Sequence, residues 1–178
     1  MLMKLLLLRH GETIENHEGT VQGWRDSHLS ERGHKQAKQA AAACTVAINA
    51  IFCSDLSRAL ETADYFKEKF PDVPFFTDWR IRELDFGSAT GSHKEDHDWE
   101  VLWASTPHDA SMIEGAESLQ LFQQRIEQFI ESITASHKKF NTILVVTHGG
   151  AINRFMQAIN KKHVYTPVEN CSITELLI

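Results

Sequence analysis

The 178-residue chain has few cysteines, few prolines and no long apolar run. Its 3 cysteines are Cys44, Cys53 and Cys171, and it has only 4 prolines. Three widely spaced cysteines do not form a dense disulfide framework, which favours a reducing compartment. The apolar run at 5–8 ends at Arg9, far short of the ~20 residues that span a bilayer, and no small-residue cleavage site follows. We therefore expect a cytoplasmic protein without a membrane segment.

Positive charge is also in deficit. The chain has 18 Lys and Arg against 24 Asp and Glu, which is a formal net charge of -6. This sign makes nucleic acid and anionic membrane surfaces poor partners, and we expect neither. A small anionic molecule is still a suitable partner, because a local group of arginines can outweigh the global charge. The composition is that of an ordinary globular protein, and the length suits a single domain over residues 1–178.

Short apolar runs alternate with longer amphipathic segments. The short runs predict strands at 5–8, 50–53, 73–77, 142–147 and 172–177. The amphipathic segments predict helices at 30–43, 56–70, 118–137 and 151–160. This alternation predicts an α/β fold with a mostly parallel sheet that is covered on both faces. The stretch at about 86–116 fits the pattern poorly, and we expect it to be a covering insertion over the site.

Chemically capable residues follow four of the predicted strands. In chain order they are Arg9 with His10, Arg58, Glu83, and His148 with Gly149. The carboxyl ends of parallel strands meet at one edge of a sheet, and ligands bind beyond that edge. We therefore expect these residues, which come from four separate parts of the chain, to converge on one site.

This set of side chains suits a phosphate ester. The planar guanidinium groups of Arg9 and Arg58 match the geometry of phosphate oxygens and can clamp them. A neutral imidazole is a good nucleophile, so His10 can form a phosphohistidine if its other ring nitrogen donates its proton, for example to a backbone carbonyl. His148, if protonated, can stabilise the equatorial oxygens. Glu83 can protonate the leaving oxygen and then activate water.

Backbone groups and one rival motif complete the local interpretation. N–H groups near Gly11 and Gly149 are predicted to add phosphate donors at helix starts. Cys53 and Arg58 invite comparison with cysteine phosphatases, but the four residues between them include no glycine. Cys53 also ends an apolar strand, where a buried thiol is inert. Glu117 either starts the helix at 118–137 or belongs to the site.

Ordered sequence blocks extend this pattern along nearly the whole chain. They are Leu8-Arg9-His10-Gly11-Glu12-Thr13 with Asn16, Gln22-Gly23, Leu29-Ser30-Glu31-Arg32-Gly33, Ser54-Asp55-Leu56-Ser57-Arg58-Ala59, Arg82-Glu83-Leu84-Asp85-Phe86-Gly87, Gly115-Ala116-Glu117-Ser118, and Val146-Thr147-His148-Gly149-Gly150. Together they resemble the histidine phosphatase superfamily, also called the phosphoglycerate-mutase-like family.

The resemblance implies a three-layer α/β/α sandwich that needs no metal and no other cofactor. It implies that His10 is the phosphorylated nucleophile and that Glu83 is the proton donor. The implied phosphate contacts are Arg9, Arg58, His148, Asn16, Gln22 and Gly23. The expected partner is a small phosphorylated metabolite, and an edge strand can pair in a homodimer.

Several activities stay open within this chemistry. Mutases of this family resemble longer chains with a closing C-terminal tail, whereas this chain ends at Ile178 with its last predicted strand. We therefore expect a metal-independent phosphomonoesterase rather than a phosphoglycerate mutase-type phosphoryl transferase. An α-ribazole-5′-phosphate phosphatase is one specific form of that activity. The non-enzyme alternative is a phosphate-binding module.

Overall fold

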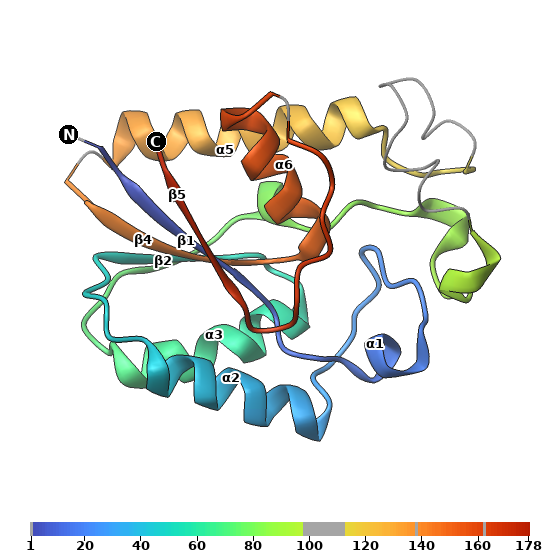
Figure 1. The fold of residues 1–178 in the computed structure, drawn as a ribbon, viewed down its shortest axis with the longest axis horizontal. Helices are drawn as coiled ribbons and strands as arrows, with labels where there is room; N and C mark the ends of the chain where they lie inside the picture. Colours follow the sequence, from blue (N-terminus) through green and yellow to red (C-terminus); the bar gives the residue numbers. More distant parts are fainter. Residues whose placement is uncertain (1, 98–112, 138, 162) are drawn as a thin grey trace.

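A central sheet with helices on both faces forms the body of the protein (Figure 1). The structure is a computed structural model that describes residues 2–97, 113–137, 139–161 and 163–178. The strands are β1 (Lys4–Arg9), β2 (Ala50–Cys53), β3 (Phe75–Thr77), β4 (Thr142–Thr147) and β5 (Ile173–Leu177), in the order β3-β2-β4-β1-β5. The first four run parallel and β5 runs antiparallel to β1, so the predicted α/β fold with a mostly parallel sheet is confirmed.

The outer layers of the expected α/β/α sandwich are formed by α2 (Glu31–Ala43), α3 (Ser57–Lys69), α5 (Leu119–Ser136) and α6 (Gly149–Ile159). The short helix α1 (Ile14–Glu18) lies apart from both layers (Figure 1). Figure 1 shows α2 and α3 on one face of the sheet, and α5 and α6 on the other. Three short 3₁₀ turns, η1 (Trp79–Ile81), η2 (Gly87–Ala89) and η3 (Lys94–Asp96), follow β3. No helix in the described ranges is long and apolar enough to cross a membrane.

Strand β1 is buried on both faces, as its continuous apolar run predicts. Leu5 and Leu7 belong to the hydrophobic cluster beneath α5 and α6, whereas Leu6 and Leu8 belong to the cluster beneath α2 and α3. Successive side chains of a strand point to opposite faces, so four consecutive leucines supply both cores. Each buried leucine contributes about 1.5–3 kcal/mol to folding.

Most predicted boundaries are confirmed, and the differences have local causes. Ser30 and Ser118 cap α2 and α5 through their side chains, as predicted for Ser30. Strand β3 begins at Phe75 rather than at residue 73, because Pro74 has no N–H to donate to a ladder. Helix α6 begins at Gly149, two residues before the prediction, with His148 as its N-cap. The glycine pair therefore lies inside the first turn of that helix.

The carboxyl edge of the sheet places the two histidines side by side. Arg9 lies opposite Thr147 in the β1–β4 ladder, and the His10 N–H donates to the Thr147 carbonyl at 2.9 Å. His10 and His148 are thus the next residues on two adjacent parallel strands. Convergence of distant motifs at this edge follows directly from the strand register.

The start of the predicted covering insertion packs beside the loop after α1. Thr20 forms an isolated β-bridge with His93, and the Lys94 N–H donates to the Gly19 carbonyl at 2.8 Å. These contacts bring η3 next to the site. The central part of the insertion, residues 98–112, lies outside the described residues.

Candidate active site

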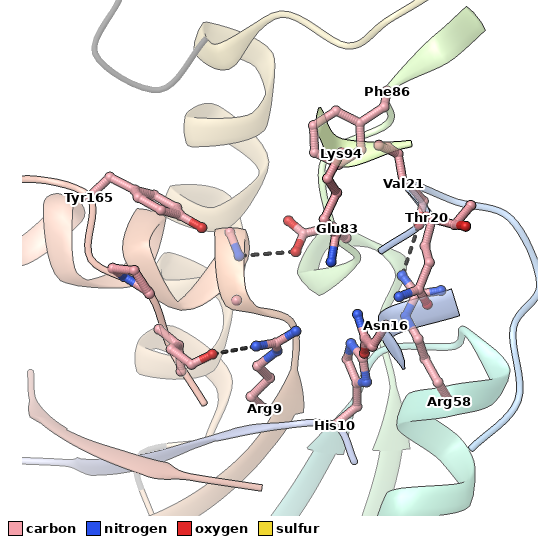
Figure 2. A pocket seen from close by; sticks show the side chains of 16 residues that line it. Arg9, His10, Asn16, Thr20, Val21, Arg58, Glu83, Phe86, Lys94 and Tyr165 are labelled. Atoms are coloured by element: carbon pink, nitrogen blue, oxygen red, sulfur yellow. Dashed lines mark hydrogen bonds between the residues drawn. The ribbon is translucent and has the colours of Figure 1, made fainter. Parts of the chain in front are cut away.

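A cavity of about 270 Å³ opens at the carboxyl edge of the sheet (Figure 2). Eight of the nine predicted site residues line it, namely Arg9, His10, Asn16, Gln22, Gly23, Arg58, Glu83 and Gly149. They come from the end of β1, from α1 and the loop after it, from the start of α3, from the loop after η1, and from the start of α6. The ninth, His148, does not line the cavity.

His10 is buried and held in one tautomer. Its ring nitrogen Nδ1 lies 2.7 Å from the carbonyl oxygen of Gly11, so Nδ1 carries the proton that it donates there. The predicted hydrogen bond from His10 to a backbone carbonyl is therefore confirmed. Burial, and then the positive charges of Arg58 and Arg9, lower the pKa of His10 well below its ordinary value. The neutral ring presents the lone pair of Nε2.

His148 lies behind His10 rather than at the cavity surface. The two ring centroids are 5.1 Å apart. Its Nδ1 accepts a hydrogen bond of 3.3 Å from Nε of Arg58, so its Nε2–H donates to Ser54 Oγ at 2.8 Å. Burial, then Arg58 and His10, lower the pKa of His148 well below its ordinary value. Here His148 is therefore neutral and holds Arg58 in place, which differs from the protonated group expected to contact phosphate.

Arg58, in the first turn of α3, is a fully buried cation. Its Nη2 donates to the Gly23 carbonyl at 2.8 Å, and its Nη1 donates to the Arg25 carbonyl at 3.1 Å. Burial lowers the pKa of Arg58 to about 10, so the guanidinium stays charged at neutral pH. With Nε bonded to His148, three of its five N–H groups have protein acceptors in the described residues. The remaining N–H groups suit an anionic ligand in the cavity.

Arg9 and Arg58 reach the cavity from opposite sides of His10 (Figure 2). Arg9 Nη1 donates to the carbonyl of Val168, in the segment before β5. Its Nε is buried and has no hydrogen-bond partner among the described residues. A buried donor without a partner costs about 1–3 kcal/mol, which an anion in the cavity would relieve.

The Glu83 carboxylate is fixed by two backbone donors. Oε1 accepts from the Leu84 N–H at 2.9 Å, and Oε2 accepts from the Gly150 N–H at 3.0 Å. Gly150 lies in the first turn of α6, where the backbone N–H groups are not used by the helix and are available to fix the orientation of the carboxyl group. Figure 2 shows the carboxylate on the far side of the cavity from His10, which places an acid and a nucleophile on opposite sides of a bound group.

The polar residues of the α1 loop hold their positions through local bonds. Asn16 forms a capping box with Thr13, and its Oδ1 also accepts from Asn170 at 3.4 Å. Gln22 is buried beside Gly23, and its Oε1 has no partner among the described residues. A backbone N–H near Gly11 was expected to donate to phosphate. For the Gly11 N–H itself this expectation is wrong, because that group already donates to Thr62 Oγ1 at 3.0 Å.

Sequence reasoning missed several residues that line the cavity. They are Thr20, Val21, Phe86, Lys94, Gly150, Tyr165, Pro167 and Val168. Lys94 brings a further cation to the cavity mouth, and Tyr165 faces the cavity near Glu83 (Figure 2). Neither lies at the end of a strand, so strand-end reasoning could not find them. The position of Lys94 inside the predicted covering insertion was the only signal.

Comparisons with known proteins identify the family of this chain. Residues 5–178 match the histidine phosphatase superfamily (branch 1). Phosphoglycerate mutase-like protein 4 of Arabidopsis thaliana is 32% identical over 84% of this chain and 67% of its own length. A solved phosphoglycerate mutase from Bacillus anthracis superposes with a TM-score of 0.88 at 26% identity, covering 99% of this chain and 88% of that one.

A second solved structure is a phosphatase by name. Mycobacterial glucosyl-3-phosphoglycerate phosphatase, in complex with VO3, superposes with a TM-score of 0.86 at 29% identity. The match covers 98% of this chain and 92% of that one. The family match and the structural likeness both extend over nearly the full length, and the chain belongs to the histidine phosphatase superfamily (branch 1).

Proposed function

We propose that this protein is a metal-independent phosphomonoesterase that works through a phosphohistidine at His10. The observation that carries the proposal is the state of that ring. It is buried, it is kept neutral, and Nδ1 is tied to the Gly11 carbonyl, so that Nε2 is the available nucleophile. Arg9 and Arg58 flank the same cavity and supply the positive charge that a phosphate group requires.

The reaction has two balanced steps. In the first, the Nε2 lone pair of His10 attacks phosphorus while the bond to the ester oxygen breaks, and the Glu83 carboxyl gives its proton to that oxygen. In the second, water attacks phosphorus, the Glu83 carboxylate takes a proton from the water, and the P–N bond breaks. The electron pair returns to Nε2 and phosphate leaves. The net reaction is ester plus water to alcohol plus phosphate.

The guanidinium groups act by stabilising charge. Negative charge builds on the phosphorus oxygens in both transition states, and fixed donors in a sheltered site are worth more than mobile water. Arg58 is pre-oriented by His148, Gly23 and Arg25, so little reorganisation accompanies the reaction. We propose that His148 contributes by orienting Arg58 and by contacting the ring of His10.

The proposed substrate is a small phosphorylated metabolite with a second anionic group. A cavity of about 270 Å³ suits a short carbon skeleton, and Lys94 adds a positive charge to its lining beyond those of Arg9 and Arg58. The positive charge of Lys94 also favours a second candidate function, which is mutase-type transfer of the phosphoryl group on a phosphoglycerate. An α-ribazole 5′-phosphate is a poorer match, because it carries no second anion for Lys94.

The central experiment measures hydrolysis of p-nitrophenyl phosphate in excess chelator. We expect turnover in the wild type, none above background in His10→Ala, and unchanged turnover in His17→Ala, an exposed histidine on α1. Enzyme quenched during turnover of a ³²P-labelled ester should carry alkali-stable, acid-labile label that His10→Ala lacks. Equal silence of wild type and variant across a panel of phosphoesters would instead support a phosphate-binding module.

A second assay separates hydrolysis from transfer. Incubation with 3-phosphoglycerate and 2,3-bisphosphoglycerate should release inorganic phosphate faster than it forms 2-phosphoglycerate. The reverse order would make the protein a mutase.

Three expectations beyond the reaction are part of the proposal. The free state of Cys44, Cys53 and Cys171 supports a cytoplasmic location. Pairing of β1 with β5, from opposite ends of the chain, supports a single domain over residues 1–178. The same strand β5 lies at the edge of the sheet, and a homodimer through such an edge stays a prediction.

A further inference from the structure

Arg125 is a buried cation that the proposed reaction does not use. It lies on the inner face of α5 and is only 3% exposed. A buried charge is costly unless a counter-ion and hydrogen bonds satisfy it. Glu117 supplies the counter-ion in a two-point pair, with Nε to Oε1 at 2.7 Å and Nη2 to Oε2 at 2.9 Å. Glu117 therefore does more than precede helix α5, whose N-cap is Ser118, because it forms a specific ion pair with Arg125.

The other N–H groups of Arg125 all donate to the segment that carries Glu83. They reach the carbonyls of Arg80 at 2.5 Å, Arg82 at 2.7 Å and Glu83 at 2.7 Å. With the two bonds to Glu117, all five N–H groups of the guanidinium are used. A single side chain thus holds three carbonyls of a four-residue stretch.

Two further donors complete this clamp. The indole N–H of Trp24 donates to the Glu83 carbonyl at 2.7 Å, and Thr147 Oγ1 donates to the Ile81 carbonyl at 2.7 Å. The Arg125 guanidinium also lies 5.9 Å from the centre of the Trp24 ring. Every carbonyl from residue 80 to residue 83 consequently accepts from a side chain. The short turn η1 ends at Ile81 and this stretch joins no strand, so these side chains help to set its position.

We infer that Arg125, oriented by Glu117 and assisted by Trp24, is a positioning residue for the acid Glu83. The inference rests on the proposed function, in which Glu83 protonates the leaving oxygen. Proton transfer requires the acid within about 2.6–3.2 Å of the accepting atom. A small displacement of the Glu83 backbone moves its carboxyl out of that range while leaving His10, Arg9 and Arg58 in place.

Leaving-group dependence distinguishes this role from a merely structural one. An alkoxide is a poor leaving group and needs the proton, whereas p-nitrophenolate leaves without much assistance. In Arg125→Lys, one ammonium keeps the charge for Glu117 but cannot reach all three carbonyls. We expect kcat/KM for an alkyl ester, glycerol 3-phosphate, to fall about tenfold or more and kcat/KM for p-nitrophenyl phosphate to fall about twofold. The value of kcat/KM reports the step that phosphorylates His10, and it excludes the later water step, in which Glu83 acts in the same way for both esters.

The matched control is Arg80→Lys. Arg80 lies in the same segment, but its side chain pairs with Asp78 and donates to the Gln128 carbonyl, away from Glu83. This variant should leave the ratio of the two kcat/KM values unchanged. Trp24→Phe is a second variant that removes one donor to the Glu83 carbonyl and leaves the buried ion pair intact. Trp24→Phe should lower the kcat/KM value for glycerol 3-phosphate relative to that for p-nitrophenyl phosphate, by a smaller factor than Arg125→Lys does. If Arg125→Lys does not fold, Trp24→Phe alone tests whether these donors position Glu83.

A double variant tests whether Arg125 acts through Glu83. In a Glu83→Gln background, adding Arg125→Lys should not change the ratio of kcat/KM values further. Equal losses on both esters, or a full additional shift in the Glu83→Gln background, would overturn the inference while leaving the phosphatase intact. A wild type that hydrolyses neither ester would contradict the proposed function, and the inference with it.

Discussion

The two sides of the cavity are built in different ways. The floor, defined as Arg9, His10 and Arg58, leaves the carboxyl edge of the sheet directly and includes two fully buried side chains. The rim, defined as Lys94 and Tyr165, comes from η3 and from the coil between α6 and β5. The floor matches what every phosphate ester shares, a phosphorus atom with charged oxygens. In the proposed reaction we expect the rim to meet the part of the ester that differs between substrates.

This difference assigns separate consequences to the two sides. A change in the floor should affect all phosphate ligands alike, whereas a change in the rim should affect one substrate and not another. Burial of His10 and Arg58 also couples the floor to the stability of the fold. Each statement can be tested by substitutions that treat the two sides separately.

The largest effect is expected from Arg58→Ala. Vanadate imitates the pentacoordinate phosphorus, and loss of a buried bidentate donor should weaken its inhibition about 10²–10³-fold. Arg32→Ala removes an exposed arginine of α2 and should leave inhibition unchanged. Inhibition constants for p-nitrophenyl phosphate hydrolysis measure both. If inhibition by vanadate is unchanged in a folded Arg58→Ala variant, Arg58 does not contact the phosphate group, and the distinction between floor and rim fails.

The next effect is a dependence of stability on pH. The folded pKa values of His10 and His148 are lowered, by burial first, whereas an unfolded histidine titrates near pH 6.5. Below about pH 6.5 the unfolded state therefore binds protons that the folded state does not, and stability falls as pH falls. Each histidine contributes a slope of up to about 1.4 kcal/mol per pH unit, and above that pH it contributes none.

Urea unfolding between pH 7 and pH 5 measures this slope. His10→Gln removes one of the two groups and should reduce the slope below pH 6.5 by about 1.4 kcal/mol per pH unit. His17→Gln, at an exposed position, is the control. A wild-type slope that His10→Gln leaves unchanged would show that burial of the floor is not coupled to stability.

The floor could be predicted from sequence because its placement is local. Arg9 and His10 follow an apolar strand, His148 follows another, and parallel strands end at one edge. The fold class followed from the same alternation of strands and helices. The hydrogen bond from His10 to a backbone carbonyl was predictable from the chemistry of a neutral nucleophile. What this reasoning could not supply was the state of His148, because its bonds to Arg58 and Ser54 join residues about ninety positions apart.

The rim could not be predicted because distant contacts place it. Lys94 reaches the cavity because its backbone bonds to Gly19, in the loop after α1. The coil that carries Tyr165 is held by Asn153, whose amide donates to the Thr166 carbonyl at 2.9 Å and accepts from its N–H at 2.8 Å. No periodic pattern marks either segment. The clamp on Glu83 was missed for the same reason, since Arg125 reads as one polar position on an amphipathic helix.

The smallest effect is expected at the rim. Lys94→Met keeps the length of the side chain and removes its charge, and Lys94 is exposed at the cavity mouth, so solvent weakens its interactions. We expect KM for 3-phosphoglycerate to rise about fivefold and KM for p-nitrophenyl phosphate to change less than about twofold, because only the first ester has a carboxylate to lose. Lys35→Met, on the exposed face of α2, controls for loss of one positive charge. Equal changes in both KM values would place Lys94 with the floor, as a contact to the phosphate that all substrates share, and the division between the two sides would fail.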